Sequence, residues 1–274
     1  MTRRSLALGA ALAVLALAPS AASAWAPAPG AIHPGVELFT NGSQCTANFI
    51  FSDGANTYIG QAAHCSGTGG NTATNGCTSG SLPLGTPVTI TGADHPGTLV
   101  YNSWLTMQAL GEKDAETCQF NDLALVQVDP ADVAKINPSV PGFGGPVGTA
   151  SLGGLGTTVY TYGNSELRGG VQKLSPKQGV SVQRSAGGWS TDVYTVTPGI
   201  PGDSGSGFLT ATGQAAGVLS TVAIAPLAGS NGVGDLPKEI AYMQGHGGPG
   251  ASVVNGTQPF NGSLVNAIAT APLS

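Results

Sequence analysis

The sequence has 274 residues, of which 8% are charged and 41% hydrophobic, and its formal net charge at pH 7 is −5. An acidic chain with so few charges lacks the basic surface that attracts phosphate groups, which argues against nucleic acid or an anionic membrane as its partner. Glycine (43 residues) and proline (19 residues) are frequent, and this composition is typical of many short strands joined by tight turns.

Residues 1–24 have the features of a signal peptide that directs export. Arg3 and Arg4 supply a positive start, an apolar run covers residues 6–17, and a cleavage site of small residues ends at Ala24. The run is shorter than the roughly 20 residues of a membrane span, and the paired arginines leave the choice between general and twin-arginine export open. Removal of two of the nine basic residues and none of the fourteen acidic ones changes the net charge from −5 to −7. We therefore expect a soluble, secreted, extracellular protein.

The rest of the chain is expected to be nearly all β. Ten short segments combine β-branched or aromatic residues with Gly, Asn, Asp or Pro at their borders. These predicted strands cover residues 45–51, 57–63, 87–91, 98–105, 123–128, 157–162, 180–184, 192–197, 207–211 and 215–222. The glycine- and proline-rich stretch 137–156 predicts a connection between two units. We place these units at residues 25–140, including an N-terminal extension, and 141–274.

Two short helices are predicted near the C-terminus. The first follows a possible N-cap at Asp235, stops at Gly245, and has an apolar stripe made of Leu236, Ile240 and Met243. The second covers residues 264–270. We expect both helices to pack against the second unit.

Four cysteines in an exported chain predict two disulfide bonds. Of the three possible pairings we favour Cys45 with Cys65 and Cys77 with Cys118, because each bond then closes a local loop within the first half of the chain. The alternative is a zinc site that combines the thiols with His64. Because the spacings fit no common zinc pattern, we expect no metal.

Three short passages contain the residue types of a nucleophilic catalytic site. They are Ala-Ala-His-Cys ending at Cys65, Asn-Asp at the start of an apolar run, and Gly-Asp-Ser-Gly-Ser-Gly over residues 202–207. A serine hydroxyl attacks well only when a base removes its proton, and histidine titrates near neutral pH. A buried carboxylate can orient the imidazole and stabilise its charged form. The candidate catalytic residues are therefore His64, Asp122 and Ser204.

These motifs, in the order His, Asp, Ser, resemble those of the chymotrypsin-like (trypsin superfamily) serine proteases. The short alanine-rich signal and the sparse cysteines resemble the secreted bacterial members. The resemblance implies two six-stranded antiparallel β-barrels with the active site between them. It also implies a serine endopeptidase that hydrolyses polypeptide substrates through an acyl-enzyme, without a cofactor, and we expect it to be a monomer.

The resemblance assigns supporting roles to residues around the triad. The backbone N–H groups of Gly202 and Ser204 would form the oxyanion hole, and a disulfide between Cys65 and Cys45 would steady the histidine loop. Ser220 would lie on the strand that pairs with the substrate backbone and would help to hold the carboxylate of the triad.

The specificity pocket is predicted from the same resemblance. Pro198 stands where trypsins carry an acid, so we expect no cleavage after Lys or Arg. Thr221 and Val222 would form part of the substrate-binding wall, and Val222 favours a small or apolar side chain before the scissile bond.

Two departures from the family pattern leave an alternative open. Gln61 replaces the usual threonine before Ala-Ala-His, and no clear mature start follows the signal. Asp203, which in many family members pairs with a newly freed N-terminus, therefore has no obvious partner. The alternative is a catalytically inert binding or surface protein on the same fold.

Other orders of the same residue types point to other folds. Ser204, Asp235 and His246 follow the order of α/β-hydrolases, whereas Asp53, His64 and Ser204 follow that of subtilisins. The nearly all-β pattern argues against both folds, because each contains alternating strands and helices.

Overall fold

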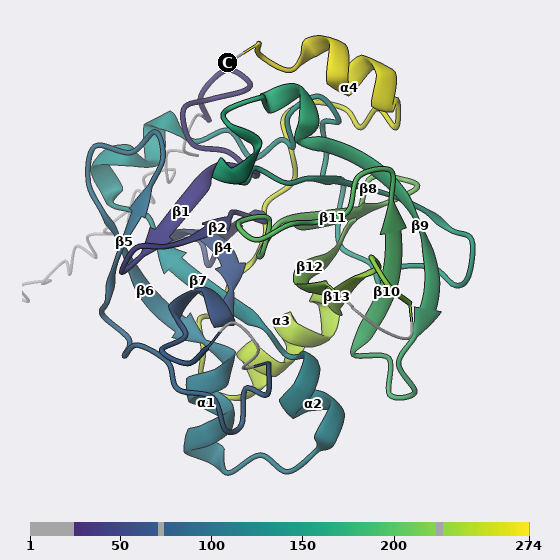
Figure 1. Cartoon of the computed structure of the whole chain (residues 1–274). Coiled ribbons are helices and arrows are strands. Elements are labelled where there is room, and N and C mark those ends of the chain that lie inside the picture. The colour runs from purple at the N-terminus through teal and green to yellow at the C-terminus, as the bar shows by residue number, and fades with distance from the viewer. Residues whose placement is uncertain (1–24, 71–73, 223–226, 274) are drawn as a thin grey trace, which may run out of the picture.

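The computed structural model describes residues 25–70, 74–222 and 227–273, so the predicted signal at 1–24 lies outside the described residues. Figure 1 shows a curled sheet beside a closed barrel, with short helices around them. Within the described part of the chain, no helix is both long and apolar enough to cross a bilayer.

The first sheet has eight antiparallel strands in the order β14-β3-β4-β7-β6-β5-β1-β2. Their bounds are β1 (Glu37–Thr40), β2 (Ser43–Thr46), β3 (Ile50–Ser52), β4 (Thr57–Ala62), β5 (Pro87–Ile90), β6 (Gly97–Asn102), β7 (Leu123–Gln127) and β14 (Ser252–Val253). The hairpin between β1 and β2 turns at Asn41 and Gly42, with φ values of 49° and 82°. Asn-Gly suits this two-residue turn because both positions require a positive φ.

This sheet differs from the closed six-stranded barrel that we predicted, because its ladder is interrupted between β2 and β3. The predicted strand 45–51 bends at Asn48, whose side-chain oxygen accepts a hydrogen bond from the N–H of Phe49. Before the bend Ala47 bonds to Val36, and after it the N–H of Asn48 bonds to the carbonyl of Gly60. The first part of this bent segment, β2, thus pairs with β1, and the second part, β3, pairs with β4. The other edge of β3 pairs with the short β14.

The second sheet is the predicted closed six-stranded barrel, in the order β10-β13-β12-β11-β8-β9. Its strands are β8 (Thr158–Tyr162), β9 (Pro176–Arg184), β10 (Ser190–Thr195), β11 (Gly207–Thr210), β12 (Ala215–Val222) and β13 (Asn231–Asp235). The sequence did not predict β13, because Asn-Gly-Val-Gly-Asp has little strand propensity. All five residues are buried, and the glycines allow close packing: a Cβ at Gly234 would lie 2.6 Å from Oε1 of Glu239.

Two helices were missed and two were predicted correctly. The predicted strand 98–105 ends at Asn102, whose side chain caps α1 (Ser103–Leu110) by accepting from two backbone N–H groups. Asp114 caps α2 (Ala115–Phe120) by accepting from the backbone N–H of Thr117. The predicted C-terminal helices are α3 (Leu236–Gly245), capped by Asp235, and α4 (Leu264–Thr270). Short 3₁₀ helices are η1 (Ala63–Ser66), η2 (Pro130–Lys135), η3 (Glu166–Arg168) and η4 (Gln172–Leu174).

Two disulfide bonds have the pairing that the sequence favoured. Cys45 in β2 is bonded to Cys65 in η1, and Cys77 is bonded to Cys118 in α2. Closing loops with separations of 20 and 41 residues restricts the unfolded chain. In the chain-entropy description each bond stabilises the fold by about 3–4 kcal/mol. The first bond ties the edge of the curled sheet to the turn that carries His64.

Candidate active site

His64 leaves the sheet on the 3₁₀ turn η1, directly after β4. The N–H of Ala63 donates to the carbonyl of Asp122 at 2.7 Å, which joins this turn to the start of β7. Cys65 anchors the other side of the turn through its disulfide. The side chain of His64 is 26% exposed, whereas that of Asp122 is 3% exposed. The fold therefore places a buried carboxylate next to a partly exposed imidazole.

Asp122 accepts hydrogen bonds from three groups that hold its carboxylate and the imidazole together. Nδ1 of His64 lies 2.7 Å from Oδ2, and the backbone N–H of His64 donates to Oδ1 at 2.9 Å. The hydroxyl of Ser220 in β12 donates to Oδ2 at 2.6 Å. Because an ionised carboxylate only accepts, Nδ1 carries the proton of the neutral ring and Nε2 is its acceptor nitrogen.

The pKa of His64 is raised above its ordinary value of 6.5. Burial is the largest single influence and lowers the pKa, because it disfavours the charged imidazolium. The negative charge of Asp122 and its hydrogen bond to the ring act in the opposite direction and together outweigh burial. The arrangement therefore stabilises a proton on the imidazole, as a general base requires.

The loop before β11 is held by bonds to its carbonyl groups. The carbonyl of Pro201 accepts a hydrogen bond from Oγ of Ser165. Thr46 donates two more, from its Oγ1 to the carbonyl of Gly202 and from its N–H to the carbonyl of Ser204. Among the described residues, the N–H groups of Gly202 and Ser204 donate to no protein atom. Gly202 has a φ of 96°, which favours glycine at this position. The loop thus has two backbone donors without an acceptor, one at Ser204 itself.

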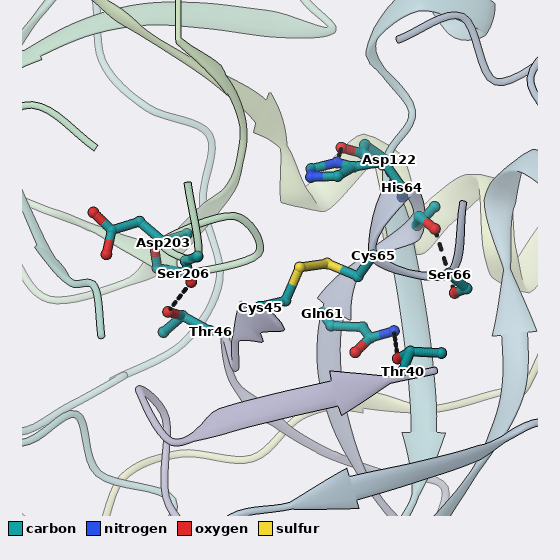
Figure 2. Close-up of a disulfide and its surroundings, with 12 residues drawn as sticks. Thr40, Cys45, Thr46, Gln61, His64, Cys65, Ser66, Asp122, Asp203 and Ser206 are labelled. Carbon is teal, nitrogen blue, oxygen red and sulfur yellow. Dashed lines mark hydrogen bonds and ion pairs between the residues drawn. A yellow bond between two sulfur atoms is a disulfide. The ribbon is translucent and has the colours of Figure 1, made fainter. Parts of the chain in front are cut away.

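The edge strand β2 joins this loop to the histidine turn. Cys45 is bonded to Cys65 beside His64, and the next residue, Thr46, binds the carbonyl of Ser204 at 2.8 Å. Figure 2 shows the disulfide between the His64 turn and the loop. Gly205 permits the approach, since a Cβ there would lie 2.6 Å from the carbonyl oxygen of Thr46. Ser204 is half-buried, and its hydroxyl makes no hydrogen bond within the described part of the chain.

Asp203, for which the sequence offered no partner, is fully buried against two cations. Its carboxylate accepts from both terminal nitrogens of Arg168 and, at 2.8 Å, from Nζ of Lys177. The side chains of Arg168 and Lys177 are 8% and 2% exposed. A Cβ at Gly163 would lie 2.5 Å from Nζ of Lys177 and 2.7 Å from Oδ1 of Asp203, so the glycine makes room for the cluster.

Charge and burial act in opposite directions on this cluster. Burial raises the pKa of Asp203, but hydrogen bonds and charge from Arg168 and Lys177 outweigh it and hold that pKa below the ordinary value. Burial also lowers the pKa of Lys177, and the charge of Arg168 adds to this effect. Two cations therefore share one carboxylate. Nothing close in the sequence connects them, since they lie 35 and 26 residues from Asp203.

The predicted substrate-binding positions lie in β12 or in the segment before the serine loop. Pro198 is exposed, and Thr221 is half-buried in β12. Val222 ends β12, but its side chain lies outside the part of the structure that is described. Gln61 is fully buried, and its amide nitrogen lies 3.3 Å from Oγ1 of Thr40. Its amide oxygen has no hydrogen-bond partner among the described residues, so the sheet satisfies only one end of this side chain.

The alternative constellations are not assembled. Asp235 bonds to Arg184, whereas Nδ1 of His246 bonds to the carbonyl of Tyr242, which separates the residues of the α/β-hydrolase order. Asp53, from the subtilisin order, bonds to Tyr58.

The zinc alternative fails for a different reason. Cys45, His64 and Cys65 do lie close together. The two sulfur atoms are joined in a disulfide, so neither cysteine offers a thiolate to a metal.

The closed barrel and the curled sheet, with the His64–Asp122 pair joined through β2 to the Ser204 loop, have the fold of solved serine proteases. Among solved structures, Thermobifida fusca Protease A is similar with a TM-score of 0.51 and 19% identity, over 82% of this chain and 99% of that chain. A glutamic acid-specific serine protease is similar with a TM-score of 0.52 and 16% identity, over 81% and 100%. At these identities the likeness concerns the fold. No family model and no curated protein matches the chain in sequence.

Proposed function

We propose that this protein is a secreted serine endopeptidase that hydrolyses peptide bonds through an acyl-enzyme. The observation that carries the proposal is the His64–Asp122 hydrogen bond of 2.7 Å, joined through β2 to the loop of Ser204. A protease fold with an oriented imidazole, tied through β2 to a serine in a glycine-rich turn, supports acyl transfer. Two disulfides support an oxidising, extracellular location. We also propose a monomer that needs no cofactor, as the resemblance implies.

In the proposed reaction Ser204 attacks the carbonyl carbon of the scissile bond while Nε2 of His64 takes the hydroxyl proton. His64 then gives this proton to the leaving amine, and a water molecule, activated by His64, hydrolyses the acyl-enzyme. Asp122 orients the imidazole and stabilises its charged form. The N–H groups of Gly202 and Ser204 are the proposed donors to the oxyanion, and their lack of protein acceptors supports this role.

For specificity, we propose a small or apolar residue before the scissile bond. Residues 196–201, which precede the serine loop, are Val-Thr-Pro-Gly-Ile-Pro and contain no carboxylate that would bind Lys or Arg. We further propose two structural units, 25–140 and 141–274, because β1 to β7 precede the boundary and β8 to β13 follow it. The strand β14 crosses back to pair with β3 of the first unit.

The proposed nucleophile is tested by labelling the purified protein with a fluorophosphonate and locating the modified residue by mass spectrometry. We expect modification of Ser204, with none on the His64→Ala variant, because the hydroxyl then lacks its base. His95→Ala is the matched control, since His95 lies in the loop between β5 and β6 and bonds to Asp132 in η2, and it should label like the unchanged protein. A folded protein that resists labelling would favour the inert binding protein on the same fold.

Peptidase activity should rise with pH and reach half of its plateau above pH 6.5, the ordinary pKa of histidine. The reason is that only neutral His64 accepts the serine proton, and Asp122 stabilises the charged form. The measurement is kcat/KM between pH 5 and 9 on an uncharged peptide substrate. A midpoint below 6.5 would mean that burial outweighs the influence of Asp122.

A further inference from the structure

A second carboxyl group is buried directly behind Asp122. Glu239 belongs to α3, which packs against β7, β12 and β13, and its side chain is fully buried. Its Oε1 accepts a hydrogen bond from the backbone N–H of Asp122 at 2.9 Å. Asp122 is thus held from three elements: by the His64 turn, by Ser220 in β12 and by Glu239 in α3.

The surroundings of Glu239 contain negative charges and unpaired polar groups. Its Oε2 has no hydrogen-bond partner among the described residues, and the same holds for the buried hydroxyl of Tyr101 and the side chain of Asn121. The titratable and charged groups that face it are Asp122 at the start of β7, Asp235 at the end of β13, Tyr101 in β6 and, through Tyr101, Tyr242 in α3. The nearby cation Arg184 is bonded to Asp235 at 2.6 Å. Among the described residues, Glu239 has no ion-pair partner of its own.

A carboxyl group in this position is most stable when it keeps its proton. Burial raises its pKa well above the ordinary value, and the charges of Asp122 and Asp235 raise it further, although the hydrogen bond from Asp122 acts in the opposite direction. An ionised Glu239 would place an uncompensated charge in the protein interior, which costs several kcal/mol. A neutral acid can still accept the N–H of Asp122 through its carbonyl oxygen.

We propose that Glu239 is a positioning residue for the catalytic pair, a neutral acid that holds the backbone of Asp122 without adding a second negative charge behind its carboxylate. The inference rests on the proposed function, because it concerns the carboxylate that orients His64. Gly234 leaves room for this side chain, since a Cβ there would lie 2.6 Å from Oε1 of Glu239.

The positioning role is tested by comparing Glu239→Gln with Glu239→Leu. Glutamine keeps a neutral carbonyl acceptor, so kcat should stay within about twofold of the unchanged protein, and the midpoint of the pH profile set by His64 should not move. Leucine leaves the N–H of Asp122 without an acceptor, so kcat should fall about tenfold while KM changes little. Equal kcat values for both variants would overturn the positioning role. A shift of the midpoint in Glu239→Gln would overturn the neutral state.

The neutral state is also tested without any activity, through Tm as a function of pH. In the unfolded chain Glu239 loses its proton above about pH 4.3, whereas the folded protein keeps it, so the unfolded state binds fewer protons and stability falls as the pH rises. Glutamine lacks this effect. The Tm of Glu239→Gln minus that of the unchanged protein should therefore be smallest at pH 4 and should grow towards pH 8.

A flat or falling difference for Glu239→Gln would mean that Glu239 is ionised in the fold, which overturns the inference. If the unchanged protein neither labels nor hydrolyses peptides, the proposed function fails by itself, and the Tm measurement still decides the charge of Glu239.

Discussion

Replacing Ser204 with alanine should abolish peptide hydrolysis and leave the protein folded. Loss of the nucleophile of a serine protease typically lowers kcat on the order of a million-fold. The change removes only the hydroxyl, which makes no hydrogen bond within the described residues, while the backbone bond from Thr46 to the Ser204 carbonyl remains. Stability should therefore change by less than about 1 kcal/mol. The measurements are kcat/KM on a peptide substrate and thermal unfolding followed by circular dichroism.

Ser206 supplies the matched control in the same glycine-rich turn. Its hydroxyl is fully buried and donates to the carbonyl of Asp203 at 2.6 Å. Ser206→Ala should lower stability by about 1 kcal/mol, because the hydrogen bond is lost, but should keep fluorophosphonate labelling. The opposite pattern, with activity kept in Ser204→Ala and lost in Ser206→Ala, would show that the nucleophile is assigned to the wrong serine.

Local sequence identifies the candidate catalytic residues, but not the contacts that support them. His64, Asp122 and Ser204 each lie in a short passage of recognisable residue types, and β12 and α4 have the predicted bounds. Helix α1 was taken for the end of a strand, because Asn102 serves both as the last residue of β6 and as the cap of the helix. The β-branched and aromatic run before Asn102 favoured a strand over a helix.

The support of the site depends on contacts between residues far apart in the chain. Glu239 contacts Asp122 although the two residues are 117 positions apart, and neither residue type nor spacing predicts that contact. The same holds for Arg168 and Lys177, which a sequence shows only as two of its nine basic residues. Such residues become visible only when the fold shows what faces a buried charge.

The cluster around Asp203 should give the largest losses of stability, in a definite order. Asp203→Asn leaves the buried cations Arg168 and Lys177 without a negative partner, which should cost about 3–5 kcal/mol. Lys177→Met should cost least, because a bidentate pair of one cation and one carboxylate remains. Arg168→Met should lie between them. Urea unfolding of the three variants at pH 7 measures this order, and a Lys177→Met loss equal to that of Asp203→Asn would contradict it.

The pH dependence of stability distinguishes the contribution of the Asp203 charge from the contribution of its side-chain packing. Because the folded pKa of Asp203 is lowered, its contribution to stability is present above the unfolded pKa of about 3.8 and is lost as the pH falls through the folded value. Asparagine has a similar shape but no charge, so the unchanged protein should lose its advantage over Asp203→Asn as the pH falls below 4. An advantage that stays constant down to pH 2 would mean that packing, and not charge, accounts for the loss.

The same cluster bears on activity, because Asp203 lies between the two proposed oxyanion donors, Gly202 and Ser204. Loss of its charge should loosen the loop, and a displaced oxyanion donor typically lowers kcat by about 10²–10³-fold. Both cations that hold Asp203 are internal side chains, so the loop conformation does not require a newly freed N-terminus in the role that the resemblance suggested. Lys177→Met, which keeps the pair with Arg168, should accordingly retain most of the activity that Asp203→Asn loses.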